Sequence, residues 1–107
     1  MKLEDLVLVS VDDHVVEPPD MFDRHVPAAY RDRAPRVVRT AKGDDVWQYE
    51  GMLRPNVGLN AVAGRPPEEY GFEPTSFAQM RRGCWDVHER IRDMNANGLL
   101  ASMCFGS

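Results

Sequence analysis

The chain has 107 residues, with 13 lysines and arginines against 17 aspartates and glutamates, so its formal net charge is −4. This length fits one domain or part of one, and the lack of a clustered basic segment argues against a nucleic-acid partner. No run approaches the ~18 apolar residues of a membrane span, the opening residues lack the apolar core of a signal peptide, and two cysteines are too few for a disulfide framework. We therefore expect a cytoplasmic protein that contacts no membrane.

The first predicted element is a strand over residues 6–12. Its first part, Leu-Val-Leu-Val-Ser-Val, is almost continuously apolar rather than alternating. Such runs are typical of strands that are buried on both faces of a parallel sheet. The strand leads into Asp12, Asp13 and His14. Because side chains alternate along a strand, Asp12 and His14 are expected on one side and Asp13 on the other.

Residues 18–85 are expected to form a long insertion. Prolines punctuate its first part, where short helical turns are predicted around 20–25 and 28–33. Residues 36–40 and 46–50 flank the sequence AKGDD, which predicts a β-hairpin with a glycine-bearing loop. The proline- and glycine-rich remainder is expected to be irregular.

A helix is predicted over residues 86–97 and a second strand over 99–105. Asp86 followed by Glu89 resembles a capping box, and Gly98 is placed to end the helix in the left-handed conformation. The helix carries one apolar stripe, formed by Val87, Ile91 and Met94.

Together these elements form one α/β unit, a β-α-β crossover of right-handed sense. Two parallel strands need neighbouring strands and helices on both faces, and the sequence supplies one clear helix. We therefore expect the N-terminal part of a larger α/β protein, whose sheet edges other protein completes.

Asp12 and His14 form a candidate metal site. A carboxylate and an imidazole on one side of a strand's carboxyl end are how barrel enzymes begin such a site, and the carboxylate suits Zn²⁺ or Mn²⁺. The alternative is a strand exit whose polar side chains cap neighbouring loops. An isolated Asp-x-His pattern favours that alternative.

Two longer segments, VDDHVVEPPDMF and GCWDVHERIRDMNANGLLASMCF, resemble the amidohydrolase-related family of metal-dependent hydrolases and decarboxylases. That family includes the aminocarboxymuconate-semialdehyde and resorcylate-type decarboxylases. The resemblance covers roughly residues 6–22 and 83–105 and implies a (β/α)₈ TIM barrel with its metal at the C-terminal face. It implies Asp12 and His14 as ligands of a divalent ion, Zn²⁺ ahead of Mn²⁺, in the place of the family's His-x-His or Glu-x-His.

The resemblance also implies a role for Glu17, which matches a glutamate frequent after this motif. Its side chain would touch the metal, bind substrate or anchor the loop before Pro18, and we favour loop anchoring. The remaining ligands and the acid/base histidine would lie beyond Ser107, so no catalytic residue is assigned.

The implied activity is hydrolysis or non-oxidative decarboxylation of a small molecule, aromatic or carboxylate-bearing, by a homo-oligomer. A catalytically incomplete fragment or truncated paralogue, acting as an oligomerising or partner-binding module, is the alternative. A small structural metal-binding protein is a third possibility, although no closed set of four ligands is evident.

Other residues able to bind a metal or a substrate are interpreted more simply. His25 and His88 are expected to face solvent, and Cys84 and Cys104 to pack without binding a metal. The aromatic residues of the middle segment could line a pocket for an aromatic substrate, but plain packing is favoured for Trp47, Tyr49, Phe72 and Trp85.

Overall fold

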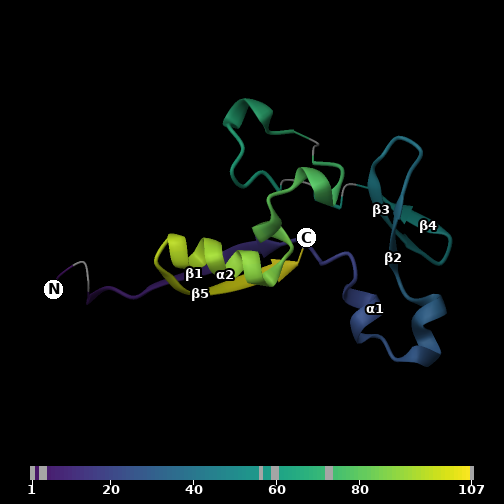
Figure 1. Cartoon of the computed structure of the whole chain (residues 1–107), viewed down its shortest axis with the longest axis horizontal. Helices are drawn as coiled ribbons and strands as arrows, with labels where there is room; N and C mark the ends of the chain where they lie inside the picture. The colour runs from purple at the N-terminus through teal and green to yellow at the C-terminus, as the bar shows by residue number, and fades with distance from the viewer. Residues whose placement is uncertain (1, 3–4, 56, 59–60, 72–73, 107) are drawn as a thin grey trace.

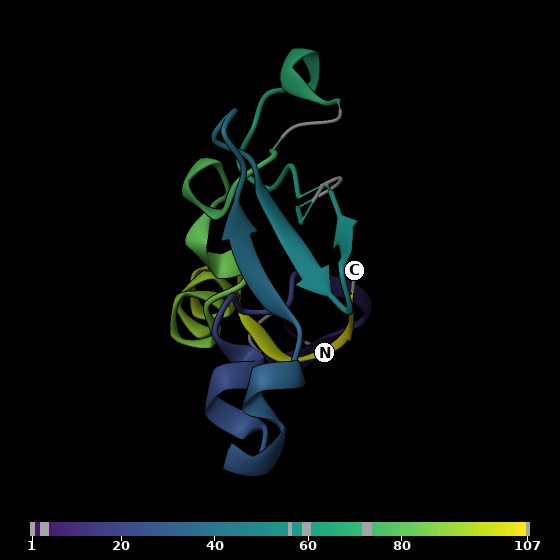
Figure 2. The same cartoon turned by 90° about the vertical axis from the view of Figure 1, so that its right-hand side faces the viewer.

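The computed structural model describes residues 2, 5–55, 57–58, 61–71 and 74–106. It is a mixed α/β structure with two separate sheets, one parallel and two-stranded, the other antiparallel and three-stranded. Figures 1 and 2 show the two sheets lying apart, with α2 beside the parallel one. The radius of gyration is 16.4 Å, against about 13 Å for a compact domain of this size. The chain is therefore more open than a self-contained domain.

The parallel sheet confirms the predicted β-α-β unit. β1 (Leu8–Val15) pairs in parallel with β5 (Leu99–Gly106), and α2 (Val87–Ala96) connects the insertion to β5. β1 begins two residues later than predicted and runs three residues further. The Asp12-Asp13-His14 segment therefore lies inside the strand, where backbone pairing fixes its side chains.

α2 begins at the predicted cap and ends at the predicted glycine. The Asp86 carboxylate accepts hydrogen bonds from the backbone N–H groups of His88 at 2.9 Å and Glu89 at 3.2 Å. In a full capping box the Glu89 carboxylate would accept the backbone N–H of Asp86. Here the Asp86 N–H donates to the Arg82 carbonyl, and the Glu89 carboxylate pairs with Arg92. Gly98 has φ +67°, the left-handed conformation that glycine adopts without steric cost.

The insertion opens with α1 (Met21–His25) and the 3₁₀ helix η2 (Ala28–Arg33), both at predicted positions. The predicted hairpin is also confirmed, since β2 (Arg36–Arg39) pairs antiparallel with β3 (Asp45–Tyr49). Later short 3₁₀ helices complete the insertion; these are η3 (Pro67–Glu69), η4 (Phe77–Gln79) and η5 (Arg82–Cys84).

A third antiparallel strand, β4 (Met52–Arg54), was not predicted. It follows β3 through the two-residue turn Glu50-Gly51, whose φ angles are +48° and +79°. Two positive φ angles are the mark of the tight hairpin turn that Asn-Gly and Asp-Gly usually signal. Glutamate is unusual at the first position of such a turn, and only the glycine at the second position matches the usual pattern. The sequence therefore did not predict this turn.

The hydrophobic core lies in the insertion rather than on the parallel sheet. Its buried members are Val16, Val57, Phe77 and Met80, and Trp47 and Trp85 pack against them. Both tryptophans also make edge-to-face ring contacts, Trp47 with Phe22 and Trp85 with Phe77, so the packing interpretation is confirmed for them. Tyr49 is exposed, and Phe72 lies outside the described residues.

The expectation that β1 is buried on both faces is wrong for this chain. Val11 is 63% exposed and Leu100 of β5 is 72% exposed. Within the described segments α2 is the one element packed closely on the sheet, and its own Val87 and Ile91 are exposed as well. No helix among the described residues is long and apolar enough to cross a membrane.

Candidate metal site at the carboxyl end of β1

The end of β1 separates its three polar residues between the two faces of the sheet. Asp13 faces α2, where its carboxylate lies 3.0 Å from the Arg90 guanidinium and accepts a hydrogen bond from the Ser102 hydroxyl. His14 lies opposite Phe105 on β5, and their rings are in contact with centroids 6.1 Å apart. Because neighbouring residues of a strand alternate, His14 and Phe105 occupy the face away from α2. The predicted division of Asp13 from His14 is therefore confirmed.

Asp13 is held by the side chains of Ser102 and Arg90. Hydrogen bonds from the Ser102 and Ser10 hydroxyls, assisted by the positive charge of Arg90, outweigh the effect of burial and hold the pKa of Asp13 below its usual value. The carboxylate is thus engaged in ionised form on the helix side. Asp13 is not available as a ligand on the other face.

Asp12 and His14 are both exposed, and neither side chain is covered by another element. A carboxylate and an imidazole are suitable donors for Zn²⁺ or Mn²⁺, so the pair fits the beginning of a metal site. Among the described residues, no third histidine, cysteine, aspartate or glutamate joins them in a metal-sized cluster. Further ligands would have to come from other protein.

Metal-binding imidazoles usually donate their second ring N–H to an acceptor. In the described part of the structure no such acceptor contacts the His14 ring, which packs against Phe105. Its backbone carbonyl, on the other hand, lies 3.4 Å from the Arg90 guanidinium. Arg90 of α2 therefore contacts the backbone of β1 at His14 and also pairs with Asp13.

Glu17 lies just after β1, at the end of β5. A side-chain carbon built on Gly106 would come within 2.6 Å of the Glu17 carboxylate, so this carboxylate rests directly on the β5 backbone. The neighbouring Val16 N–H donates to the Cys84 carbonyl at 2.9 Å. Glu17 thus occupies a position where it can hold the loop before Pro18 against the sheet, close to the strand end that carries His14.

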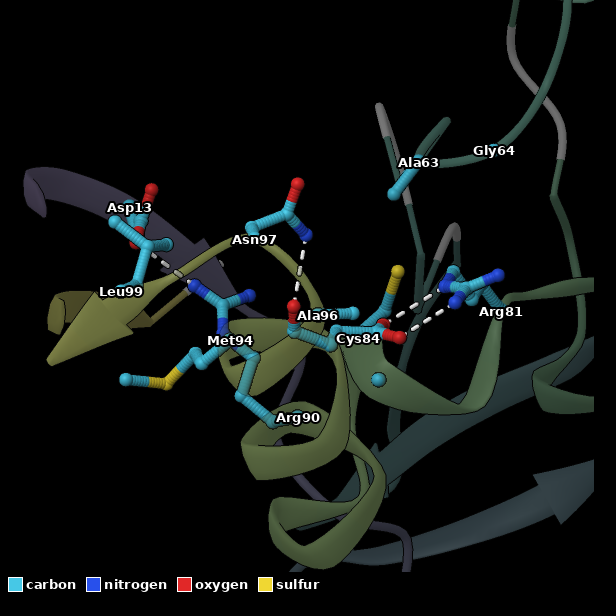
Figure 3. Close-up of a pocket in the computed structure, with 12 residues that line it drawn as sticks. Asp13, Ala63, Gly64, Arg81, Cys84, Arg90, Met94, Ala96, Asn97 and Leu99 are labelled. Carbon is cyan, nitrogen blue, oxygen red and sulfur yellow. Dashed lines mark hydrogen bonds and ion pairs between the residues drawn. The ribbon is translucent and has the colours of Figure 1, made fainter. Parts of the chain in front are cut away.

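An open cleft of about 350 Å³ lies beside α2 (Figure 3), lined by residues of α2, η5 and the insertion together with Asp13 of β1 and Leu99 of β5. Its charged groups are paired: Arg81 donates to Asp93 at 2.7 Å, and Arg90 faces Asp13. Asp12 and His14 do not line this cleft. The cleft and the candidate metal pair are therefore separate features.

The remaining candidates follow the predictions with one exception. His25 and His88 are exposed, as expected. Cys84 is buried, and this burial raises the pKa of its thiol. Cys104, expected to be packed, is exposed, and its sulfur touches the Ser102 hydroxyl and the Arg90 guanidinium.

No protein-family model matches the chain, and a comparison with curated proteins likewise finds no significant match.

Proposed function

We propose that the protein is a metal-dependent hydrolase or non-oxidative decarboxylase of the amidohydrolase-related type, and that this chain forms the N-terminal β-α-β portion of a (β/α)₈ barrel. The observation that supports this most directly is the division of the strand end. Asp12 and His14 are both exposed to solvent, while Asp13 is engaged by Arg90 on the helix side. Barrel enzymes place their ligands at this position, at the carboxyl ends of the strands.

In this proposal Asp12 and His14 hold one divalent ion, with Zn²⁺ preferred to Mn²⁺, together with ligands from elsewhere in the protein. When bound, such an ion supplies Lewis-acid polarisation or lowers the pKa of water from about 15.7 to near 7. Glu17 anchors the loop that follows. The substrate is a small molecule that is aromatic or bears a carboxylate.

The uncovered face is the second support for a larger assembly. Large apolar side chains are exposed on both strands, including Val9, Val11, Leu100, Met103 and Phe105. An open sheet with free edges readily pairs with other strands. We propose that other protein covers this face, either the rest of a barrel or a second copy of the chain. Light scattering should then give a mass above 12.1 kDa, and a stable, well-folded monomer would contradict this part of the proposal.

The same exposed face favours the alternative of an oligomerising or partner-binding module without catalysis. Metal binding distinguishes the two. Two ligands without their partners should bind a divalent ion only weakly, so the ¹⁵N-labelled chain is titrated with a large excess of Co²⁺. The resonances of Asp12 and His14 should then broaden more than those of other residues. His14→Ala should abolish this effect, because it removes one of the two proposed ligands.

His25→Ala is the matched control, since His25 is an exposed histidine far from β1 in sequence and carries no predicted metal role. It should leave the broadening at Asp12 unchanged. If the wild-type chain and His14→Ala respond to Co²⁺ alike, the ligand assignment is wrong and the non-catalytic alternative is preferred.

A further inference from the structure

The register of the parallel sheet shifts twice: β5 has one extra residue between Leu99 and Ala101, and β1 has one extra residue between Ser10 and Asp13, beside its candidate ligands. Ser10 pairs with Ser102 and Asp13 pairs with Cys104, so three steps along β1 (10 to 13) match two steps along β5 (102 to 104). One strand with an extra residue is a β-bulge, a feature that is uncommon between parallel strands and frequent next to functional sites, where it redirects side chains.

The bulge decides which residues share a face. In a regular strand, residues three apart lie on opposite faces, so Ser10 and Asp13 could not both face α2. In this structure they share a face, because their partners on β5, Ser102 and Cys104, lie two residues apart and both contact Arg90 of α2. The extra residue lies at Val11 or Asp12, and His14 is directed to the uncovered face.

Arg90 of α2 contacts both strands at this point (Figure 3 shows its pairing with Asp13). Its guanidinium lies 3.0 Å from the Asp13 carboxylate, 3.3 Å from the Ser102 hydroxyl and 3.6 Å from the Cys104 sulfur. The side chain is only 22% exposed. A largely covered cation needs a counter-charge, and Asp13 supplies it only while the bulge keeps Asp13 on the helix side.

We infer that Arg90 is a positioning residue: together with Asp13 and Ser102, it holds the β1 bulge that includes or adjoins Asp12 and that directs His14 to the face away from α2. The register part of this inference stands by itself. The part that concerns metal affinity rests on the proposed function. Loss of Arg90 removes the electrostatic reason for Asp13 to face α2, so the strand end is expected to loosen or to shift in register.

The test compares Arg90→Met with Arg92→Met by NMR. Both changes remove an arginine from the same helix, but the Arg92 side chain is 73% exposed and pairs only with Glu89 of the same helix among the described contacts. In Arg90→Met, the cross-strand contacts between Asp13 and Cys104 should weaken or move. Amides of residues 12–14 should exchange hydrogen about tenfold faster, as expected for loss of a charge-assisted hydrogen bond. Arg92→Met should leave both measurements unchanged.

If Arg90→Met does not fold, Asp13→Asn replaces it, because this change keeps the shape and removes only the counter-charge. Unchanged register and exchange in a folded Arg90→Met or Asp13→Asn variant would overturn the inference. Co²⁺ binding to Arg90→Met should weaken about tenfold, the lower end of what loss of a supporting residue costs a metal site. Failure of the wild-type chain to bind Co²⁺ would count against the proposed function, while the register measurements would still decide the role of Arg90.

Discussion

Asp45 is expected to be the most important charged side chain for the stability of the insertion. It begins β3, and its side chain is 8% exposed. One carboxylate oxygen accepts the backbone N–H of Phe77, a core residue, at 2.9 Å. The carboxylate also pairs with the Arg39 guanidinium at 3.0 and 3.2 Å. Asp45 thus joins the hairpin to the core across 32 residues of sequence.

The cost of Asp45→Ala follows from these contacts. A buried hydrogen bond from an N–H group to a charged acceptor contributes about 1.5–3 kcal/mol. The Arg39 side chain is 60% exposed, so its ion pair is screened by solvent and adds at most about 1 kcal/mol. We therefore expect Asp45→Ala to lower the free energy of unfolding by about 2–3 kcal/mol, with the Phe77 bond as the larger part.

Urea denaturation followed by tryptophan fluorescence suits this measurement, because Trp47 and Trp85 both pack against the core. Asp44→Ala is the matched control. Asp44 precedes Asp45, and the hydrogen bonds between Asp44 and Thr40 involve only the Asp44 backbone. Removal of the Asp44 side chain should therefore lower the free energy of unfolding by less than about 0.5 kcal/mol. Equal destabilisation by the two substitutions would refute the reasoning.

The same carboxylate predicts a pH dependence. Burial alone would raise the pKa of Asp45, but the bonds from Arg39 and the Phe77 N–H outweigh it and lower this pKa. A lowered pKa in the folded state means that the stabilisation is complete above the unfolded value of about 3.9 and is lost as the pH falls through the folded value. The stability difference between wild type and Asp45→Asn should therefore be constant near pH 7 and shrink below pH 4.

Three further predictions concern α2 and the cysteines. Asp86→Ala removes the N-cap bonds to His88 and Glu89 and should lower the urea-derived free energy of unfolding by about 1 kcal/mol. Gly98→Ala forces a side chain into φ +67° and should cost about 1–2 kcal/mol in the same assay. Iodoacetamide should label exposed Cys104 in the native protein and buried Cys84 only in urea, as read by mass spectrometry; native labelling of Cys84 would contradict its burial.

The local structure of this chain could be predicted from local signals. Asp86 and Gly98 marked the two ends of α2, and the AKGDD loop marked the hairpin. Each depends on contacts between residues only a few positions apart, which the sequence displays directly. The Glu50-Gly51 turn escaped prediction because the backbone conformation of Glu50 is one that glutamate rarely adopts.

The candidate pair Asp12 and His14 could likewise be proposed from spacing alone, because side chains alternate along any strand. Spacing could not reveal the bulge or the partners of Asp13. These depend on Ser102 and Arg90, which lie 89 and 77 positions after Asp13 in the chain. Contacts over such separations leave no periodic signal in one sequence.

The sequence by itself therefore determined the order of the main elements and the parallel pairing of β1 with β5, but not β4 or the short 3₁₀ helices of the later insertion. The tertiary structure alone decided that the core forms around Val57, Phe77 and Met80 in the insertion, and that the apolar strands stay uncovered. The physical reason is that an apolar run expresses a tendency to be buried but does not specify the surface that buries it. That surface is set by which elements pack together, and among the described residues only α2 packs closely on the parallel sheet.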